Sequence, residues 1–328
     1  PFLLAGKEVY TSVSIGIAQS NSVYEGPDEM LRDADTAMYH AKSLGKGRYE
    51  LFDAKMRANV MARLQLETDL RHALERGEFR NFYQPIVNLA SGEIAGFEAL
   101  LRWQHPTRGL LGPIEFIGVV EETGLIREVG WWNLSEACRQ ISEWRAASPS
   151  NRDLIISVNL SAKQFLQPNL VSDIANLLRE ISLSPEALKL EITESTVMKD
   201  PSGAVEMLQE IKSLGVRLAI DDFGTGYSSL SYLHRFPLDT LKIDRSFISS
   251  MDDDGDGMEI ARTILPMAKN LRLDVVAEGV ETIEQFELLK KFNCAYGQGY
   301  YFSRPLSAEG TTALLNGELA WQGFVQSK

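Results

Sequence analysis

Acidic and amide side chains stand at the ends of a series of short apolar segments in this sequence of 328 residues. Each comes at or directly after the carboxyl end of a segment whose pattern predicts a β-strand. These side chains are Glu98, Asn159, Glu191, Asp221, Asp222, Asp244, Glu278 and Gln298. So many carboxylates would repel one another in a narrow space unless cations held them together. The pattern therefore predicts a metal site.

The ligand types indicate which cation this site would hold. Oxygen donors without a nearby histidine or cysteine favour Mg²⁺ or Mn²⁺ over zinc. Adjacent Asp221 and Asp222 would point to opposite faces of a continuing strand. We expect Gly224 and Gly226 to end the strand at once, so that both carboxylates turn toward one site and one of them bridges two ions. Two ions about 4 Å apart can activate a water and hold a phosphoryl oxygen for in-line displacement.

Lys242 lies in a predicted strand, two residues before Asp244. Two nearby cations would lower the pKa of its ammonium group, so we expect Lys242 to deprotonate or orient the attacking water. The chain has 4 histidines, and they share no metal-ligand spacing. Catalysis of the Ser–His or Cys–His type is therefore not expected.

Short apolar strands, mostly separated by helices, must position these residues. The strands are expected at 82–89, 94–101, 154–158, 187–192, 216–220, 240–243, 274–277 and 297–302. Apolar residues at helical spacing predict helices between them, for example at 129–146, 169–181, 202–214, 258–271 and 282–292. Repeated strand–helix units over about 250 residues indicate an α/β fold, a (β/α)₈ TIM-like barrel with function at the carboxyl ends of its strands. A tight turn at 90–93 makes the first two strands a hairpin, so the first strand is antiparallel.

The first 53 residues form a separate, partial α/β segment in this interpretation. A strand at 9–18, a helix at 28–44 and a strand at 48–52 bury too little surface for an independent domain. Residues 54–76 contain no Gly or Pro and predict a linker helix that Gly77 ends. We therefore expect three parts: 1–53, the linker helix 54–76, and a barrel domain at 77–328.

Composition excludes several classes of protein. With 44% hydrophobic and 24% charged residues, the chain is not disordered or collagen-like. A formal net charge of −12 argues against binding a nucleic-acid polymer or an anionic membrane. Cys138 and Cys294 lie in apolar contexts and are expected to be reduced, which fits a cytoplasmic protein. The start at Pro1 suggests a piece of a longer protein, in which a membrane anchor could lie upstream.

Several strings at these positions resemble the EAL-domain family, the cyclic di-GMP phosphodiesterases of bacteria. They are YQPIV (83–87), EALLRW (98–103), SVNLS (157–161), LEITES (190–195), DDFGTGYSSL (221–230), LKID (241–244), AEGVET (277–282) and GQGYYFSRP (297–305). They occur in the family's order and cover residues 77 to about 317, with no departure at any metal or base position. The resemblance implies hydrolysis of cyclic di-GMP to linear pGpG.

The resemblance also implies residue roles. A first metal would be held by Glu98, Asn159, Glu191 and Asp221, and a second by Asp221, Asp222 and Glu278, with Lys242 as the base. Gln298 and Asp244 would lie near the attacking water, and Glu194 would brace the loop that begins at Asp222. Substrate contacts would come from Arg102 at a phosphate, from Asp244, and, at the guanines, from Gln84, Leu100 and the segment between Phe302 and Pro305.

The first 53 residues resemble the tail of a GGDEF domain, the diguanylate cyclase fold, through VSIGIA (13–18) and LRDADTAMYHAKSLGKGRYELFD (31–53). The motif that names that domain is absent from this tail. The resemblance therefore implies a remnant without cyclase activity, regulated together with upstream sensor and GGDEF regions. Homodimerisation through the barrel is expected by resemblance alone. The alternative to an enzyme is a non-catalytic cyclic di-GMP receptor that signals to a protein partner.

Overall fold

The computed structural model describes residues 2–4, 7–20, 24–224, 230–251 and 256–318. The chain divides into two compact units, Pro1–Ala73 and Leu74–Lys328. The division falls three residues before the expected end of the linker helix at residue 76. Each unit is described by itself.

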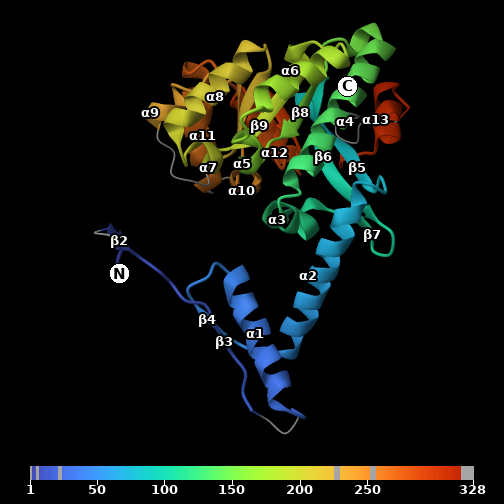
Figure 1. Ribbon diagram of the computed structural model, residues 1–328. Coiled ribbons are helices and arrows are strands. Elements are labelled where there is room, and N and C mark those ends of the chain that lie inside the picture. Colours follow the sequence, from blue (N-terminus) through green and yellow to red (C-terminus); the bar gives the residue numbers. More distant parts are fainter. Residues whose placement is uncertain (1, 5–6, 21–23, 225–229, 252–255, 319–328) are drawn as a thin grey trace. The chain divides into compact units, whose positions relative to one another are not determined.

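The first unit contains two small sheets and two helices (Figure 1). Strands β1 (Phe2–Leu4) and β2 (Lys7–Val9) pair antiparallel, and β3 (Ile15–Ile17) pairs parallel with β4 (Tyr49–Leu51). Helix α1 (Pro27–Ser43) lies directly on β3, because a Cβ at Gly16 would be 2.2 Å from the backbone nitrogen of Met38. One strand was expected at 9–18, but Val9 ends β2, residues 10–14 join no strand, and β3 covers only Ile15–Ile17.

A buried carboxylate ties α1 to helix α2 (Ala54–Ala73). Asp33 on α1 is 1% exposed. It accepts hydrogen bonds from Nε of Arg57 on α2 and from the hydroxyl of Tyr24, each at 3.1 Å. This arrangement fixes α2 against α1 within the unit.

The second unit is a closed barrel in the described part of the chain. Its strands are β5 (Phe79–Asn88), β6 (Ile94–His105), β8 (Ile155–Asn159), β9 (Leu188–Thr193), β10 (Arg217–Phe223), β11 (Thr240–Ile243), β12 (Asp274–Glu278) and β13 (Tyr296–Gln298). Neighbours are parallel from β6 through β8 to β13, whereas β5 is antiparallel to both β13 and β6 and closes the ring. The expected barrel with an antiparallel first strand is confirmed. A short strand, β7 (Gly109–Leu111), pairs antiparallel with the end of β6 and lies outside the ring.

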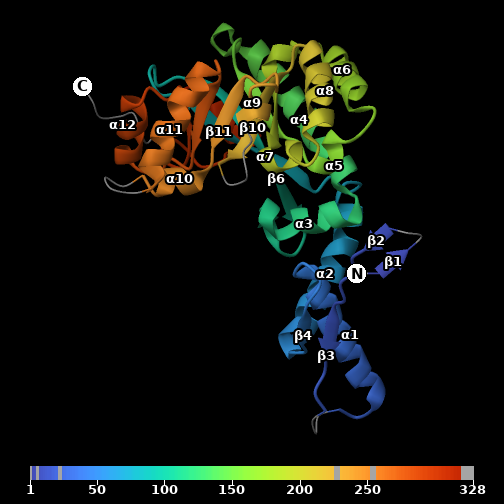
Figure 2. The same cartoon turned by 90° about the vertical axis from the view of Figure 1, so that its left-hand side faces the viewer.

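Helices cover the outside of the strands (Figure 2). The longer ones are α3 (Pro113–Thr123), α4 (Ile126–Ala147), α6 (Leu170–Glu180), α8 (Pro201–Ser213), α11 (Asp256–Asn270), α12 (Ile283–Lys291) and α13 (Ala308–Leu315). Short helices α5 (Ala162–Phe165), α7 (Glu194–Val197), α9 (Leu230–Leu233) and α10 (Arg245–Ser249) follow strands. Outward-facing strand residues such as Leu190, Ile220 and Leu241 pack with these helices into one hydrophobic core. No helix among the described residues has the length and apolar character needed to cross a lipid bilayer.

Two expectations from the sequence need correction. The strand expected at 297–302 ends at Gln298, because the chain turns there and the backbone nitrogens of Phe302 and Ser303 bond to the carbonyl of Gly299. Helix α3 was not anticipated. It begins at Pro113 and ends at Thr123, and the next residue, Gly124, has a φ of 83°, the left-handed conformation that glycine favours at helix ends.

Gly96 on β6 gives a test of barrel closure. A Cβ at this position would lie 2.2 Å from the carbonyl oxygen of Ile155 on β8, so we expect Gly96→Ala to destabilise the protein by about 1–3 kcal/mol. Gly118→Ala is the matched control, because nothing lies within 4 Å of its Cβ and alanine favours the helix interior. Urea unfolding measures both variants. Equal stability of the two would contradict the close β6–β8 approach.

Candidate active site

Inward-facing residues of the parallel strands meet at the carboxyl end of the barrel. In the strand register Glu98 lies beside Ser157, Asn159 beside Glu191, and Glu278 beside Gln298. Because alternate residues of a strand face the same side, these side chains and Lys242 share the barrel interior. The polar residues at the carboxyl ends of separate apolar strands thus lie close together.

Lys242 is the centre of this cluster. Its side chain is 1% exposed, and its ammonium nitrogen lies 2.5 Å from Glu191 Oε2 and 2.5 Å from Glu278 Oε1. Asp221 Oδ1 is at 3.3 Å and Glu98 Oε2 at 3.4 Å. One ammonium group therefore faces carboxylates from four different strands.

The electrostatics of this cluster are unbalanced. Burial raises the pKa of Glu191 to about 7, although Lys242 opposes this shift. Burial likewise raises the pKa of Glu278 well above its ordinary value. Burial alone would lower the pKa of Lys242, but the surrounding carboxylates raise it well above its usual range. The lowered pKa expected from the sequence depended on bound cations, and the carboxylates of the chain act in the opposite direction.

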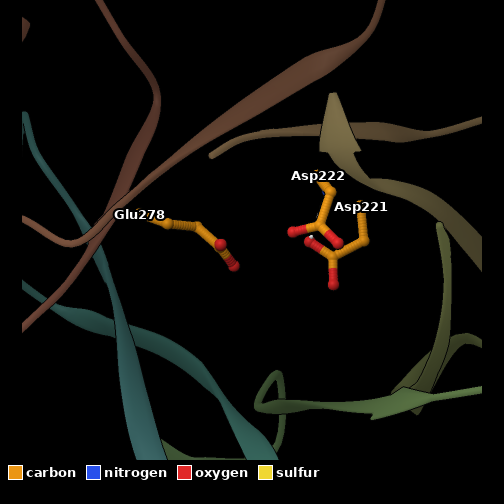
Figure 3. A group of neighbouring side chains, drawn as sticks. All are labelled: Asp221, Asp222 and Glu278. Atoms are coloured by element: carbon orange, nitrogen blue, oxygen red, sulfur yellow. Dashed lines mark hydrogen bonds between the residues drawn. The ribbon is translucent and has the colours of Figure 1, made fainter. Parts of the chain in front are cut away.

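Asp221 and Asp222 both face this site. The strand ends at Phe223, directly before Gly224 as expected, but Asp222 still lies within the strand, and Gly226 lies outside the described residues. The pairing of β10 with β11 is irregular between Ile220 and Phe223, and Asp222 has a φ of 54°. Such a bulge re-aims one side chain of a strand. Figure 3 shows the carboxylates of Asp221 and Asp222 side by side, with Glu278 reaching toward them from β12.

This group is a candidate cation site. Ligand atoms of Asp221, Asp222 and Glu278 all lie within 4.8 Å of one another. Burial, followed by the charge of Asp221, raises the pKa of Asp222, so binding a cation would relieve both effects. Gln298 adds a second sign of fit, because its Oε1 is buried without a hydrogen-bond partner among the described residues. An all-oxygen donor set of this kind suits a hard divalent cation.

Amide side chains hold Glu98 in place. Asn159 Nδ2 donates to Glu98 Oε1 and Gln298 Nε2 donates to Glu98 Oε2, each at 2.6 Å. Gln298 Nε2 also lies 3.1 Å from Gln84 Oε1, and Gln84 donates to the carbonyl of Ser303 at 3.2 Å. These contacts link β5, β6, β8 and β13 at the mouth.

Glu194 and Asp244 lie at the starts of short helices. Glu194 is 5% exposed, and its Oε2 accepts a hydrogen bond from the backbone nitrogen of Gly224 at 3.1 Å. It therefore contacts the chain directly after β10, while residues 225–229 lie outside the described residues. Asp244 caps α10 by accepting from the backbone nitrogen of Ser246 at 3.0 Å.

A cavity of about 260 Å³ opens beside the cluster. Its lining residues are Gln84, Glu98, Leu100, Asp221, Arg245, Glu278, Gly279, Glu281, Gln298, Gly299 and Tyr300. Gln84 and Leu100 are thus brought to the carboxylates, as expected. Arg245, Glu281 and Tyr300 were not predicted as site residues, although Arg245 directly follows LKID (241–244), Glu281 lies within AEGVET (277–282) and Tyr300 within GQGYYFSRP (297–305).

Four predicted substrate contacts, Arg102, Asp244, Phe302 and Pro305, are not among the residues that line this cavity. Phe302 is 2% exposed, and its ring packs edge-on against Phe286 and Tyr301. Pro305 precedes Leu306, which pairs with Tyr83 on β5. Arg102 lies on β6, where its guanidinium donates to the carbonyl of Leu101 and stands 5.8 Å from the ring centre of Phe82. Burial lowers the pKa of Arg102.

Known proteins resemble this chain over both sequence and structure. The EAL domain profile matches residues 67–305. A bifunctional diguanylate cyclase/cyclic di-GMP phosphodiesterase, MucR of Pseudomonas aeruginosa, is 45% identical over 309 residues, which are 94% of this chain and 45% of MucR. The cyclic di-GMP phosphodiesterase NbdA of the same organism is 40% identical over 93% of this chain and 39% of its own length. The chain thus spans less than half of these relatives.

Solved structures agree with this similarity. The PaMucR phosphodiesterase in complex with c-di-GMP matches with a TM-score of 0.73 and 46% identity, over 75% of this chain and 99% of that chain. The EAL enzyme Bd1971, in a form with cAMP and cyclic di-GMP bound, matches with a TM-score of 0.74 and 34% identity, over 78% of this chain and 70% of that chain.

The raised pKa of Glu191 predicts how stability depends on pH. The folded protein keeps a proton on Glu191 up to about pH 7, whereas the ordinary value is 4.5. This contribution to stability is therefore complete below pH 4.5 and is lost as the pH rises toward 7. In a chelator we expect the melting temperature to fall over this interval, and Mg²⁺ or Mn²⁺ to restore it near neutral pH.

Glu191→Gln is the control for this experiment, since a neutral amide has no proton to lose. The melting temperature of this variant should fall less over the pH interval and should rise less when cations are added. A wild-type melting temperature that Mn²⁺ does not change at neutral pH would contradict the interpretation.

The bulge at Asp222 predicts a difference between two variants that remove the same charge. Asparagine tolerates positive φ better than alanine, so Asp222→Ala should be less stable than Asp222→Asn by about 1 kcal/mol in a chelator. Both variants should lose stabilisation by Mn²⁺ to a similar extent. Urea unfolding with and without Mn²⁺ tests both points, and equal stabilities in the chelator would argue against the left-handed conformation.

Proposed function

The chain belongs to the EAL domain family, and from this membership we propose that it hydrolyses cyclic di-GMP to linear pGpG. The observation that carries the proposal is the enclosure of Lys242 by carboxylates from four strands at the carboxyl end of the barrel. A cavity beside these groups gives a substrate access to them. MucR and NbdA are described as cyclic di-GMP phosphodiesterases, and the PaMucR phosphodiesterase was solved in complex with this nucleotide. These descriptions support the choice of substrate.

The proposal includes two divalent cations, Mg²⁺ or Mn²⁺. Glu98, Asn159, Glu191 and Asp221 would hold one, and Asp221, Asp222 and Glu278 the other. Bound there, such ions supply a nucleophilic water at neutral pH and stabilise the charge that develops on the phosphoryl group. The close approach of Asp221, Asp222 and Glu278 supports the second set.

The chain's own residues orient and move protons in the proposed reaction. A water oxygen forms a bond to one phosphorus as the bond from that phosphorus to the 3′ oxygen breaks, and the 3′ oxygen gains a proton. Lys242 accepts the proton of the water once cations share the negative charge of the carboxylates around it. Gln298 holds Glu98 through its amide nitrogen, while its buried carbonyl oxygen has no hydrogen-bond partner among the described residues.

Other residues position the substrate and the loop after β10. Gln84 and Leu100 line the cavity and would contact a guanine. Asp244, at the start of α10, would contact both the substrate and the water. Glu194 would keep the metal-binding Asp222 in place through its hydrogen bond to Gly224. Arg102 at a phosphate, and Phe302 and Pro305 at a guanine, remain predictions from the family resemblance.

Residues 1–53 are proposed to be the C-terminal remnant of a GGDEF domain, with 54–76 as linker helix and 77–328 as the phosphodiesterase domain. Exposed apolar side chains on one face of the β3–β4 sheet support this: Ile15 is 51% exposed, Tyr49 67% and Leu51 44%. Helix α1 lies on the other face, at Gly16. A sheet face of this kind is usually covered by further structure, and the relatives are longer than this chain. Upstream GGDEF and sensor regions are the proposed regulators.

A cytoplasmic location and a homodimer are also part of the proposal. Cys138 and Cys294 are buried free thiols, and burial raises the pKa of each to about 12. Unreactive thiols of this kind are compatible with the proposed cytoplasmic location. Homodimerisation through the barrel stays a prediction that rests on the resemblance.

Hydrolysis of cyclic di-GMP by the purified chain tests the function. With Mg²⁺ or Mn²⁺ we expect pGpG as the product, and Lys242→Met should lower kcat about 10²- to 10⁴-fold because a general base is lost. Lys212→Met is the matched control, since Lys212 pairs with Asp239 outside the cluster. Wild-type protein that binds cyclic di-GMP with metal present and leaves it intact would instead favour the non-catalytic receptor.

A further inference from the structure

Arg245 is the one basic side chain that lines the cavity among the described residues. It is the first residue of α10 and directly follows Asp244. Nothing in the proposed reaction uses it so far. Its side chain is exposed and makes no hydrogen bond or ion pair with the residues that the structure describes. A free guanidinium thus faces a cavity whose other charged residues are all acidic.

The backbone beside Arg245 leaves room for it. Gly279 follows Glu278 at the end of β12 and has a φ of 69°. A Cβ at Gly279 would lie 2.5 Å from the Cβ of Arg245. Arg245 therefore rests directly against the end of the strand that carries Glu278, at the edge of the carboxylate cluster.

Charge explains why a cation at this edge matters. The proposed metal ligands carry the carboxylates of Glu98, Glu191, Asp221, Asp222 and Glu278. Two divalent cations would offset four of these five negative charges, and a protonated Lys242 would offset the fifth, so the loaded cluster has no net positive charge to attract an anion. A cyclic dinucleotide carries two phosphodiester anions, and only one can lie at the metal ligands. The other needs a separate cation.

We propose that Arg245 binds the second phosphodiester of the substrate, the one that is not cleaved. This inference rests on the proposed function. A guanidinium presents parallel N–H donors that match two oxygens of a phosphate. Arg102, the other candidate, does not line the cavity and already donates to the carbonyl of Leu101. By holding one of the two equivalent phosphodiesters, Arg245 thereby helps to place the other at Lys242.

Steady-state kinetics of two variants test this role. Arg245→Gln should raise KM for cyclic di-GMP about tenfold, the lower end of the range for a charged hydrogen bond, and change kcat less than about twofold. Arg245→Lys keeps the charge without the planar group, so its KM should rise by a smaller factor. Arg179→Gln on α6 is the control, and its KM should equal that of the wild type. A KM unchanged in Arg245→Gln would overturn the inference while leaving the hydrolase activity intact.

Equilibrium binding supplies a readout that does not depend on turnover. In the Lys242→Met background, Arg245→Gln should weaken binding of cyclic di-GMP about tenfold, and salt should affect the remaining binding less. The 7-deazaguanine analogue separates phosphate binding from base reading, because arginine can also bond to N7 and O6 of guanine. Equal losses for both ligands support the phosphate contact. A smaller loss with the analogue would assign Arg245 to the base and overturn the proposal.

Discussion

Negative charge concentrated around one buried ammonium group is the constraint on which the rest of this structure depends. Lys242 is 1% exposed and lies within 3.4 Å of carboxylate oxygens from four strands. One positive charge cannot compensate so many negative ones in a medium that screens poorly. Burial raises the pKa of Glu191 and of Glu278, and the single charge of Lys242 does not cancel this effect. Divalent cations would remove the imbalance, and the same cations would let Lys242 release a proton. The global charge of −12, which opposes binding of polyanions, thus coexists with an acidic group, Asp221, Asp222 and Glu278, that could hold a cation.

The barrel is what brings these charges together. Parallel strands with alternating side chains place every second residue in the interior, and the carboxyl ends of all of them meet at one mouth. Regular alternation would nevertheless send Asp222 away from Asp221. The irregular pairing after Ile220 and the φ of 54° at Asp222 return it to the site. The hydrogen bond from Gly224 to the buried carboxylate of Glu194 holds the chain just after this bend. A local departure from strand geometry thereby supports the chemistry.

Much of this arrangement could be predicted from the sequence, and the exceptions have physical reasons. Periodicity places a residue on a strand and on a face, so the strand pattern by itself identifies Glu98, Glu191 and Lys242 as neighbours. Periodicity says nothing of a bulge, and the strand end before Gly224 does not by itself explain the paired orientation of Asp221 and Asp222, because Asp222 still lies within β10. Phe302 was expected at a guanine from the family resemblance alone, and periodicity carries no information on such a role; its side chain is 2% exposed. Arg245 could not be predicted because an exposed arginine at the start of a helix has no distinctive pattern.

Anomalous diffraction at the manganese edge, from crystals of the protein grown with Mn²⁺, tests the central claim most directly. The account predicts two anomalous peaks, both in contact with Asp221, one toward Glu98 and Glu191 and the other toward Asp222 and Glu278. Their appearance would show that the excess carboxylates are there to bind cations. The account would be contradicted if crystals grown in saturating Mn²⁺ showed no anomalous peak at Asp221 and Lys242 still contacted Glu191 and Glu278.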